Sequence, residues 1–186
     1  MSSKNILSAL IIGPTDKTKI FRFGKIKPAD YLSFLEEISL PLVKYCNRIN
    51  LISDEGIPLD VARVYKRLGG QKAIGYVPHG GQDSLKPYFS VFDSVEEFDS
   101  GWNALNTCLS LKGDIVVAFG LSPGTIVELA YTSYHKRFLG KIIPIFLDSR
   151  TISRKLNPEI EENLAITYFN SGSELEDLLR KGCRNG

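Results

Sequence analysis

The stretch Gly113–His135 reads GDIVVAFGLSPGTIVELAYTSYH and joins three local patterns. Its β-branched run Ile115–Phe119 predicts a buried strand, and the apolar spacing after the turn predicts a helix. Ser122 followed by proline is typical of a helix N-cap, so we expect the backbone N–H groups of Gly124 and Thr125 to point out of the turn. A helix that starts at the carboxyl end of a strand is a common anion site in open α/β sheets. We therefore expect a ligand at this turn.

Length, charge and cysteine content narrow the class of protein. A chain of 186 residues with 43% hydrophobic residues is long enough for one sizeable core, which predicts a single domain over residues 1–186. Its net charge of +2 does not suggest a nucleic-acid partner or a membrane surface. The apolar stretch within residues 1–10 is too short and too interrupted for a signal peptide or a membrane span. The three cysteines are widely spaced, which indicates neither a disulfide framework nor a metal site. We expect a cytoplasmic protein without a cofactor.

Strand and helix patterns alternate along the chain. Apolar runs predict strands over residues 6–12, 49–53, 72–78, 87–92, 115–119, 141–147 and 165–169. Helical spacing predicts helices that start near residues 28, 58 and 123 and helices over residues 95–111 and 171–181. Such alternation predicts an α/β fold of three layers, with a doubly wound, mostly parallel sheet in which the strand over residues 6–12 is central.

Some segments carry more specific expectations. Residues 17–27 are basic with interleaved aromatics and are expected to form a loop or short hairpin, whereas residues 148–163 are polar and are expected to form an exposed excursion. Pro144 favours an edge position for the strand over residues 141–147, because proline cannot donate a hydrogen bond to a neighbouring strand. Ser173 and Glu176 have the spacing of a capping box at the start of the last helix.

Two further turns follow the first and second strands and face the same edge of the sheet as the turn before Gly124. Asp54 and Glu55 would repel a second phosphate, so they suit ribose hydroxyls or a bridging cation, although acids before a helix also complement its dipole. The candidate ligand-binding residues of these turns are Gly13, Pro14, Thr15, Ser53, Asp54, Glu55 and Gly56.

Together, the turns after the first and second strands and the stretch 114–128 resemble a Rossmann-like superfamily. It contains the Lonely-guy-type nucleotide phosphoribohydrolases, the DprA single-strand-binding proteins and the SLOG nucleotide-sensing domains. The family's third motif reads Pro-Gly-Gly-x-Gly-Thr-x-x-Glu, and Gly124, Thr125 and Glu128 match it. Leu121 and Ser122 replace two glycines, which leaves the backbone less room to approach a phosphate. The resemblance implies that a ligand contacts Gly120, Ser122, Gly124, Thr125 and Glu128.

The hydrolases also carry an arginine and a lysine on the helix before the motif. Leu105 and Asn106 occupy those places here, and Trp102 and Asn103, one turn earlier, could stand in for them as ligand contacts. The missing arginine argues against full hydrolase activity. The resemblance also implies a homodimer or larger assembly, although no residue pattern indicates an interface.

A second resemblance is to the nucleoside deoxyribosyltransferases, in which the glutamate of a Gly-Thr-x-x-Glu-x-Ala-Tyr motif attacks the sugar. Here that motif starts at Gly124, Glu128 would be the nucleophile, and a Gly-Pro turn at Gly13 fits as well. The stretch Ser53–Arg63 favours the first family. We therefore expect a protein that binds a nucleotide as a small molecule and hydrolyses its N-glycosidic bond weakly or not at all. The transferase remains the alternative.

Glu128 has three interpretations from the sequence alone. It could stabilise the charge that develops on the sugar as an N-glycosidic bond breaks, or contact the ligand without chemistry. It could also form a capping box with Thr125, because T-x-x-E at a helix start satisfies two backbone donors without any ligand.

Overall fold

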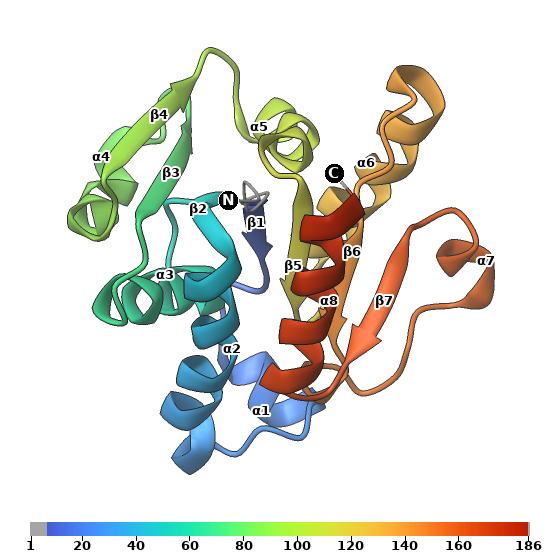
Figure 1. Ribbon diagram of the computed structural model, residues 1–186. Helices are drawn as coiled ribbons and strands as arrows, with labels where there is room; N and C mark the ends of the chain where they lie inside the picture. Colours follow the sequence, from blue (N-terminus) through green and yellow to red (C-terminus); the bar gives the residue numbers. More distant parts are fainter. Residues whose placement is uncertain (1–6, 186) are drawn as a thin grey trace, which may run out of the picture.

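A seven-stranded, fully parallel sheet forms the centre of the protein, in a computed structural model that describes residues 7–185. The strand order is β4-β3-β2-β1-β5-β6-β7, which confirms the doubly wound sheet and the central first strand (Figure 1). Ile6 of the predicted first strand lies outside the described residues. The strands are β1 Leu7–Ile12, β2 Cys46–Ile52, β3 Lys72–Pro78, β4 Ser94–Phe98, β5 Ile115–Phe119, β6 Ile145–Asp148 and β7 Ile166–Phe169.

Helices cover both faces of the sheet and complete the three layers. α1, α2, α3 and α8 pack on one face, and α5 and α6 pack on the other. The helices are α1 Thr18–Phe23, α2 Tyr31–Tyr45, α3 Ile57–Arg67, α4 Gln82–Leu85, α5 Trp102–Leu109, α6 Pro123–Leu139, α7 Pro158–Glu161 and α8 Gly172–Asn185.

The order of the strands decides where a ligand could bind. From β1 the chain moves outward through β2 and β3 to β4, and then returns to the other side of β1 as β5. In such sheets the connections on either side of the reversal diverge, which opens a crevice at the carboxyl ends of the two central strands. Every residue of β1 and β5 is buried, so these strands form a fixed base for that crevice.

Three predictions over residues 17–111 are wrong. Residues 17–27 are not a loop or hairpin but contain α1, which packs Ile20 into the core. The strand expected over residues 87–92 is instead a 3-10 segment, Lys86–Val91, and the helix expected over residues 95–111 is replaced by β4 and the shorter α5. The Asp93 carboxylate, just before β4, accepts a hydrogen bond from the Ala73 backbone N–H and ties the edge strand β4 to β3.

Three predictions near the C-terminus also need correction. β6 is not an edge strand, because it lies between β5 and β7; Pro144 precedes it and its carbonyl accepts a bond from Val116. The excursion after β6 is only partly exposed, since Asp148 and Thr151 are buried. At the start of α8 the cap is Ser171, whose hydroxyl accepts from the Glu174 backbone N–H, and not the predicted pair of Ser173 and Glu176.

Within residues 7–185, no helix is long and apolar enough to cross a membrane. Over the same residues, no group of three or more His, Cys, Asp or Glu side chains is arranged to hold a metal ion.

Candidate functional site

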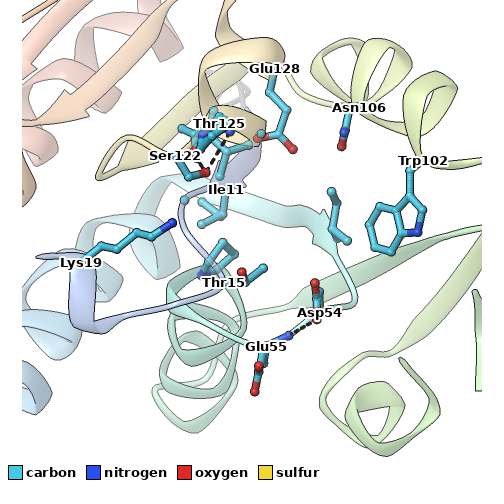
Figure 2. A pocket seen from close by; sticks show the side chains of 16 residues that line it. Ile11, Thr15, Lys19, Asp54, Glu55, Trp102, Asn106, Ser122, Thr125 and Glu128 are labelled. Atoms are coloured by element: carbon cyan, nitrogen blue, oxygen red, sulfur yellow. Dashed lines mark hydrogen bonds between the residues drawn. The ribbon is translucent and has the colours of Figure 1, made fainter. Parts of the chain in front are cut away.

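A cavity of about 290 Å3 opens at the carboxyl ends of β1 and β2, beside the start of α6. It lies in the crevice that the strand order creates between the two halves of the sheet (Figure 2). Its lining residues are Ile11, Ile12, Gly13, Thr15, Lys19, Ile52, Asp54, Glu55, Pro58, Trp102, Asn106, Ser122, Pro123, Gly124, Thr125 and Glu128.

The start of α6 has the N-cap that the sequence predicts. Ser122 is the N-cap residue, Pro123 is the first helical residue, and the Ser122 hydroxyl accepts from the Thr125 backbone N–H at 3.2 Å. The Thr125 N–H is therefore occupied, contrary to the expectation that it points to a ligand. Gly124 keeps an N–H that has no partner within the helix, because the first turn of a helix lacks acceptors for its donors. A 17-residue helix also adds the positive end of its dipole at this point.

Gly120 does not line this cavity. Its backbone N–H donates to the Thr151 hydroxyl at 2.7 Å, so it is not free to bind an anion. Its φ of +69° is the left-handed conformation, and a Cβ there would stand 3.0 Å from the Pro14 ring. The conformation of the turn and its packing against the loop after β1 therefore explain this glycine without a ligand.

Glu128 points its carboxyl group into the cavity from one turn farther along α6 (Figure 2). The residue is only 6% exposed, and burial raises the pKa of its carboxyl group to about 8. At pH 7 this group is mostly protonated and can donate a hydrogen bond. The capping-box interpretation is wrong, because the N-cap is Ser122 and Thr125 is already the third helical residue.

The loop after β2 supplies the wall of the cavity that faces α6. Asp54 and Glu55 line the cavity, and the partial burial of Asp54 raises the pKa of its carboxyl group. Ser53 and Gly56 do not line it: Ser53 is fully buried, and Gly56 lies against the loop after β1, where a Cβ would be 2.4 Å from the Cα of Thr15. Gly56 also has a φ of +103°, so its role is to let the two loops meet.

The loop after β1 contributes Gly13 and Thr15 to the lining, whereas Pro14 is buried and lies outside it. Lys19, on α1, also lines the cavity and was not among the predicted site residues. Figure 2 shows its side chain extending toward the start of α6. The basic stretch over residues 17–27 was the available signal, but only the folding of this stretch into a helix decides which lysine faces the cavity.

α5 provides the third wall through Trp102 and Asn106, which are four residues apart and so lie on one face of the helix. Asn103, a predicted ligand residue, points elsewhere: it is exposed and does not line the cavity. Trp102 is 43% exposed, so the indole is a wall of the cavity and not a core residue.

The cavity therefore has two chemically different ends. Lys19, Ser122 and Thr125 lie on one side, Trp102 and Asn106 lie on the other, and Glu128 stands between them (Figure 2). A lysine with a helix N-terminus favours an anion, and an exposed indole favours a flat ring. Such a cavity can hold a ligand that is charged at one end and aromatic at the other.

Comparisons with known proteins support the fold. No protein-family model matches the chain, and no curated protein does so either. Among solved structures, the molybdenum cofactor carrier protein of Chlamydomonas reinhardtii is 17% identical, with a TM-score of 0.68 over 97% of this chain and 99% of that one. The molybdenum cofactor binding protein of Rippkaea orientalis is 17% identical, with a TM-score of 0.63 over 96% and 98% of the two chains.

The DNA processing protein DprA of Streptococcus pneumoniae is a more distant neighbour. It is 10% identical, with a TM-score of 0.55 over 91% of this chain and 60% of that one. The chain therefore has the Rossmann-like fold that the molybdenum cofactor carriers and DprA share, as the resemblance of its motifs predicts.

Proposed function

We propose that this chain is a single cytoplasmic domain that binds a nucleotide or nucleotide-derived ligand at the carboxyl ends of the central strands. The ligand's phosphate would lie beside Gly124, Thr15 and Lys19, and its base would lie against Trp102. The observation that carries the proposal is that one cavity combines a helix N-terminus and a lysine at one side with an exposed indole at the other.

Size and charge support a mononucleotide. A cavity of about 290 Å3 is at the lower end of the roughly 300–1,000 Å3 typical of small-molecule pockets, which is too small for a dinucleotide. Asp54 and Glu55, on the wall across from α6, would repel a second phosphate but suit ribose hydroxyls as hydrogen-bond acceptors.

The state of Glu128 supports binding with little or no chemistry. A glutamate that acts as a nucleophile or general base on a sugar must be ionised, whereas burial raises the pKa of Glu128 to about 8. In its neutral form the side chain can donate a hydrogen bond to a ligand and does not repel a phosphate nearby. Any phosphoribohydrolase activity is therefore expected to be weak at pH 7 and to increase as the pH rises through 8.

Calorimetry with purine and pyrimidine nucleoside monophosphates, and with the matching nucleosides, tests the proposal. Lys19→Met should weaken monophosphate binding about tenfold, because it removes one charged hydrogen bond to phosphate. Trp102→Ala should weaken binding of monophosphate and nucleoside alike by about tenfold or more, which is the usual effect of losing a base-stacking aromatic. Lys25→Met, an exposed lysine of the same basic stretch outside the cavity, is the matched control and should change little. The absence of heat with every compound would refute the proposal.

A second candidate ligand is the molybdenum cofactor, since two neighbours of nearly the same length carry or bind it. Molybdenum measured by elemental analysis in protein purified from cells that make this cofactor would distinguish it. A stoichiometric amount that Trp102→Ala abolishes would favour the cofactor over a simple nucleotide.

The transferase alternative makes a different prediction. With Glu128 as nucleophile, the protein would exchange bases between deoxynucleosides and form a covalent sugar on that side chain. Base exchange followed by chromatography, with Glu128→Gln as the control, tests this. Exchange at pH 7 at the rate of an ordinary enzyme would contradict the binding proposal.

A further inference from the structure

A second, smaller cavity lies beside the turn between β5 and α6. It has a volume of about 100 Å3, and we refer to it as the side cavity, enclosed by α1, the turn 120–121 and residues 151–153. Lys19 lines both the side cavity and the candidate ligand cavity, and its side chain extends toward the start of α6 (Figure 2). Leu121 lines the side cavity, whereas the next residue, Ser122, lines the larger one. The two cavities therefore meet at Lys19 and at this turn.

Hydrogen bonds hold the walls of the side cavity together. The Gly120 backbone N–H donates to the Thr151 hydroxyl at 2.7 Å, which joins the turn after β5 to the segment after β6. The Lys25 backbone N–H donates to the Arg150 carbonyl at 2.6 Å, which joins the chain just after α1 to the same segment. The side cavity is therefore preformed, and a ligand group that enters it orders few protein atoms.

The lining of the side cavity is mostly apolar. Phe23, Leu121 and Ile152 supply apolar side chains from α1, from the turn and from the segment after β6. Its two hydroxyl groups are those of Thr151, which is already hydrogen-bonded, and of Ser153, which is exposed. Within the described part of the chain, no acidic side chain lines this cavity. The side cavity therefore suits a small apolar group.

The position of Lys19 decides what that apolar group is attached to. Lys19 and Phe23 are four residues apart on α1 and so lie on one face of the helix, with the ammonium group at the larger cavity and the ring at the side cavity. Leu121 stands where the family's third motif has a glycine, and it lines the side cavity and not the larger one. The departure from the motif thus adds an apolar wall next to the point where an anion would bind.

We propose that the side cavity receives a substituent on the ligand's phosphate, so that the ligand is a nucleotide whose phosphate is esterified to a small apolar group. The proposal rests on the proposed function, which places the phosphate beside Lys19 and the base against Trp102. A group bonded to that phosphate on the side away from the ribose would enter the side cavity. A volume of about 100 Å3 is less than the roughly 150 Å3 of a cavity that holds benzene, so the group has only a few carbon atoms.

Calorimetry with the methyl and propyl esters of adenosine and cytidine 5′-monophosphate tests the inference. Both esters of a nucleotide carry one negative charge, so the comparison isolates two additional CH2 groups. Their burial should make the propyl ester bind about tenfold more tightly than the methyl ester. Equal affinities for the two esters, together with measurable binding of the free monophosphate, would overturn the inference and leave the proposed function standing. The absence of heat with all of these compounds would refute both.

Variants of the side cavity locate the effect. Phe23→Ala and Leu121→Ser should each reduce the tenfold preference for the propyl ester to about threefold or less, because each removes apolar contacts with the propyl group. Phe138→Ala is the matched control: this phenylalanine is 69% exposed, lines neither cavity and should leave the preference unchanged. A preference that both side-cavity variants retain would overturn the inference. So would a nucleoside diphosphate that binds more tightly than the propyl ester, because the side cavity would then accept a second phosphate.

Discussion

The helices on the two faces of the sheet pack in opposite ways. α2 turns a row of large apolar residues inward, each no more than 4% exposed: Phe34, Leu35, Ile38 and Leu42. α6 buries only one large aliphatic side chain, Leu129, and its other buried residues are polar: Thr125, Glu128, Thr132 and His135. The face under α2 therefore supplies most of the hydrophobic stabilisation, while the face under α6 buries polar groups that stabilise the fold little.

The difference coincides with the position of part of the candidate site. Buried polar groups need hydrogen bonds, and the His135 ring meets the Ser110 hydroxyl at 2.6 Å, which ties α6 to the segment that follows α5. α5 and α6 supply Trp102, Asn106, Glu128 and the helix N-terminus at Ser122 to the lining of the cavity. The layer that contributes less to the core thus supplies one part of the candidate site, and the loops after β1 and β2 and Lys19 on α1 supply the rest.

The largest effect is expected in the α2 layer. Ile38 is fully buried, so Ile38→Ala should destabilise the protein by about 2–5 kcal/mol, through lost burial and the cavity left behind. Urea unfolding measures this. Leu40→Ala on the same helix, where the side chain is 56% exposed, should cost less than about 1 kcal/mol. Equal effects at the two positions would break the comparison between the layers.

In the α6 layer, a substitution of Glu128 should stabilise the folded protein. The folded state holds the Glu128 proton up to a pKa of about 8, whereas the unfolded state releases it near the ordinary glutamate pKa of 4.5. Between these values the folded state binds more protons, so natural stability falls as pH rises, by up to about 1.4 kcal/mol per pH unit. Glu128→Gln removes this pH-dependent loss and should be more stable than the natural chain by about 3 kcal/mol at pH 7. Urea unfolding of both proteins from pH 4 to 9 measures the difference, and parallel curves would contradict it.

A smaller effect is expected at the start of α6. Ser122→Ala removes the acceptor for the Thr125 backbone N–H and should destabilise by about 1 kcal/mol, as loss of an N-cap does. The control is Ser133→Ala, because the Ser133 hydroxyl bonds only to a carbonyl of its own helix. Thermal unfolding should separate the two variants, and equal melting temperatures would show that the cap contributes nothing.

The smallest effect is expected at Thr132, which is buried but whose hydroxyl donates only to the Leu129 carbonyl of its own helix. Thr132→Val should change stability by about 0.5 kcal/mol or less, because replacing a locally satisfied hydroxyl with a methyl group is nearly neutral. Urea unfolding checks this. A loss above about 2 kcal/mol would mean that the polar contacts of α6 stabilise the fold as strongly as the core under α2 does.

The errors of prediction have a common physical cause. Residues 93–98 look like a helix start in sequence, but Asp93 bonds to β3 and Lys66, and the segment forms an edge strand. Pro144 suggests an edge position, yet β6 begins just after it and is paired on both sides. In each case a partner distant in sequence outweighs the local preference.

Local patterns by themselves determined the alternation of strands and helices, the buried β5 and the Ser122 cap, because these depend on hydrophobic periodicity and on atoms within a few residues. The motifs also predicted Gly13, Asp54 and Trp102 as site residues, and these three residues line the cavity. Only the tertiary structure decided that Lys19 and Asn106 face the cavity while Asn103 and Gly120 do not. It also decided that burial keeps Glu128 protonated, because orientation, burial and charge depend on how separate elements pack together.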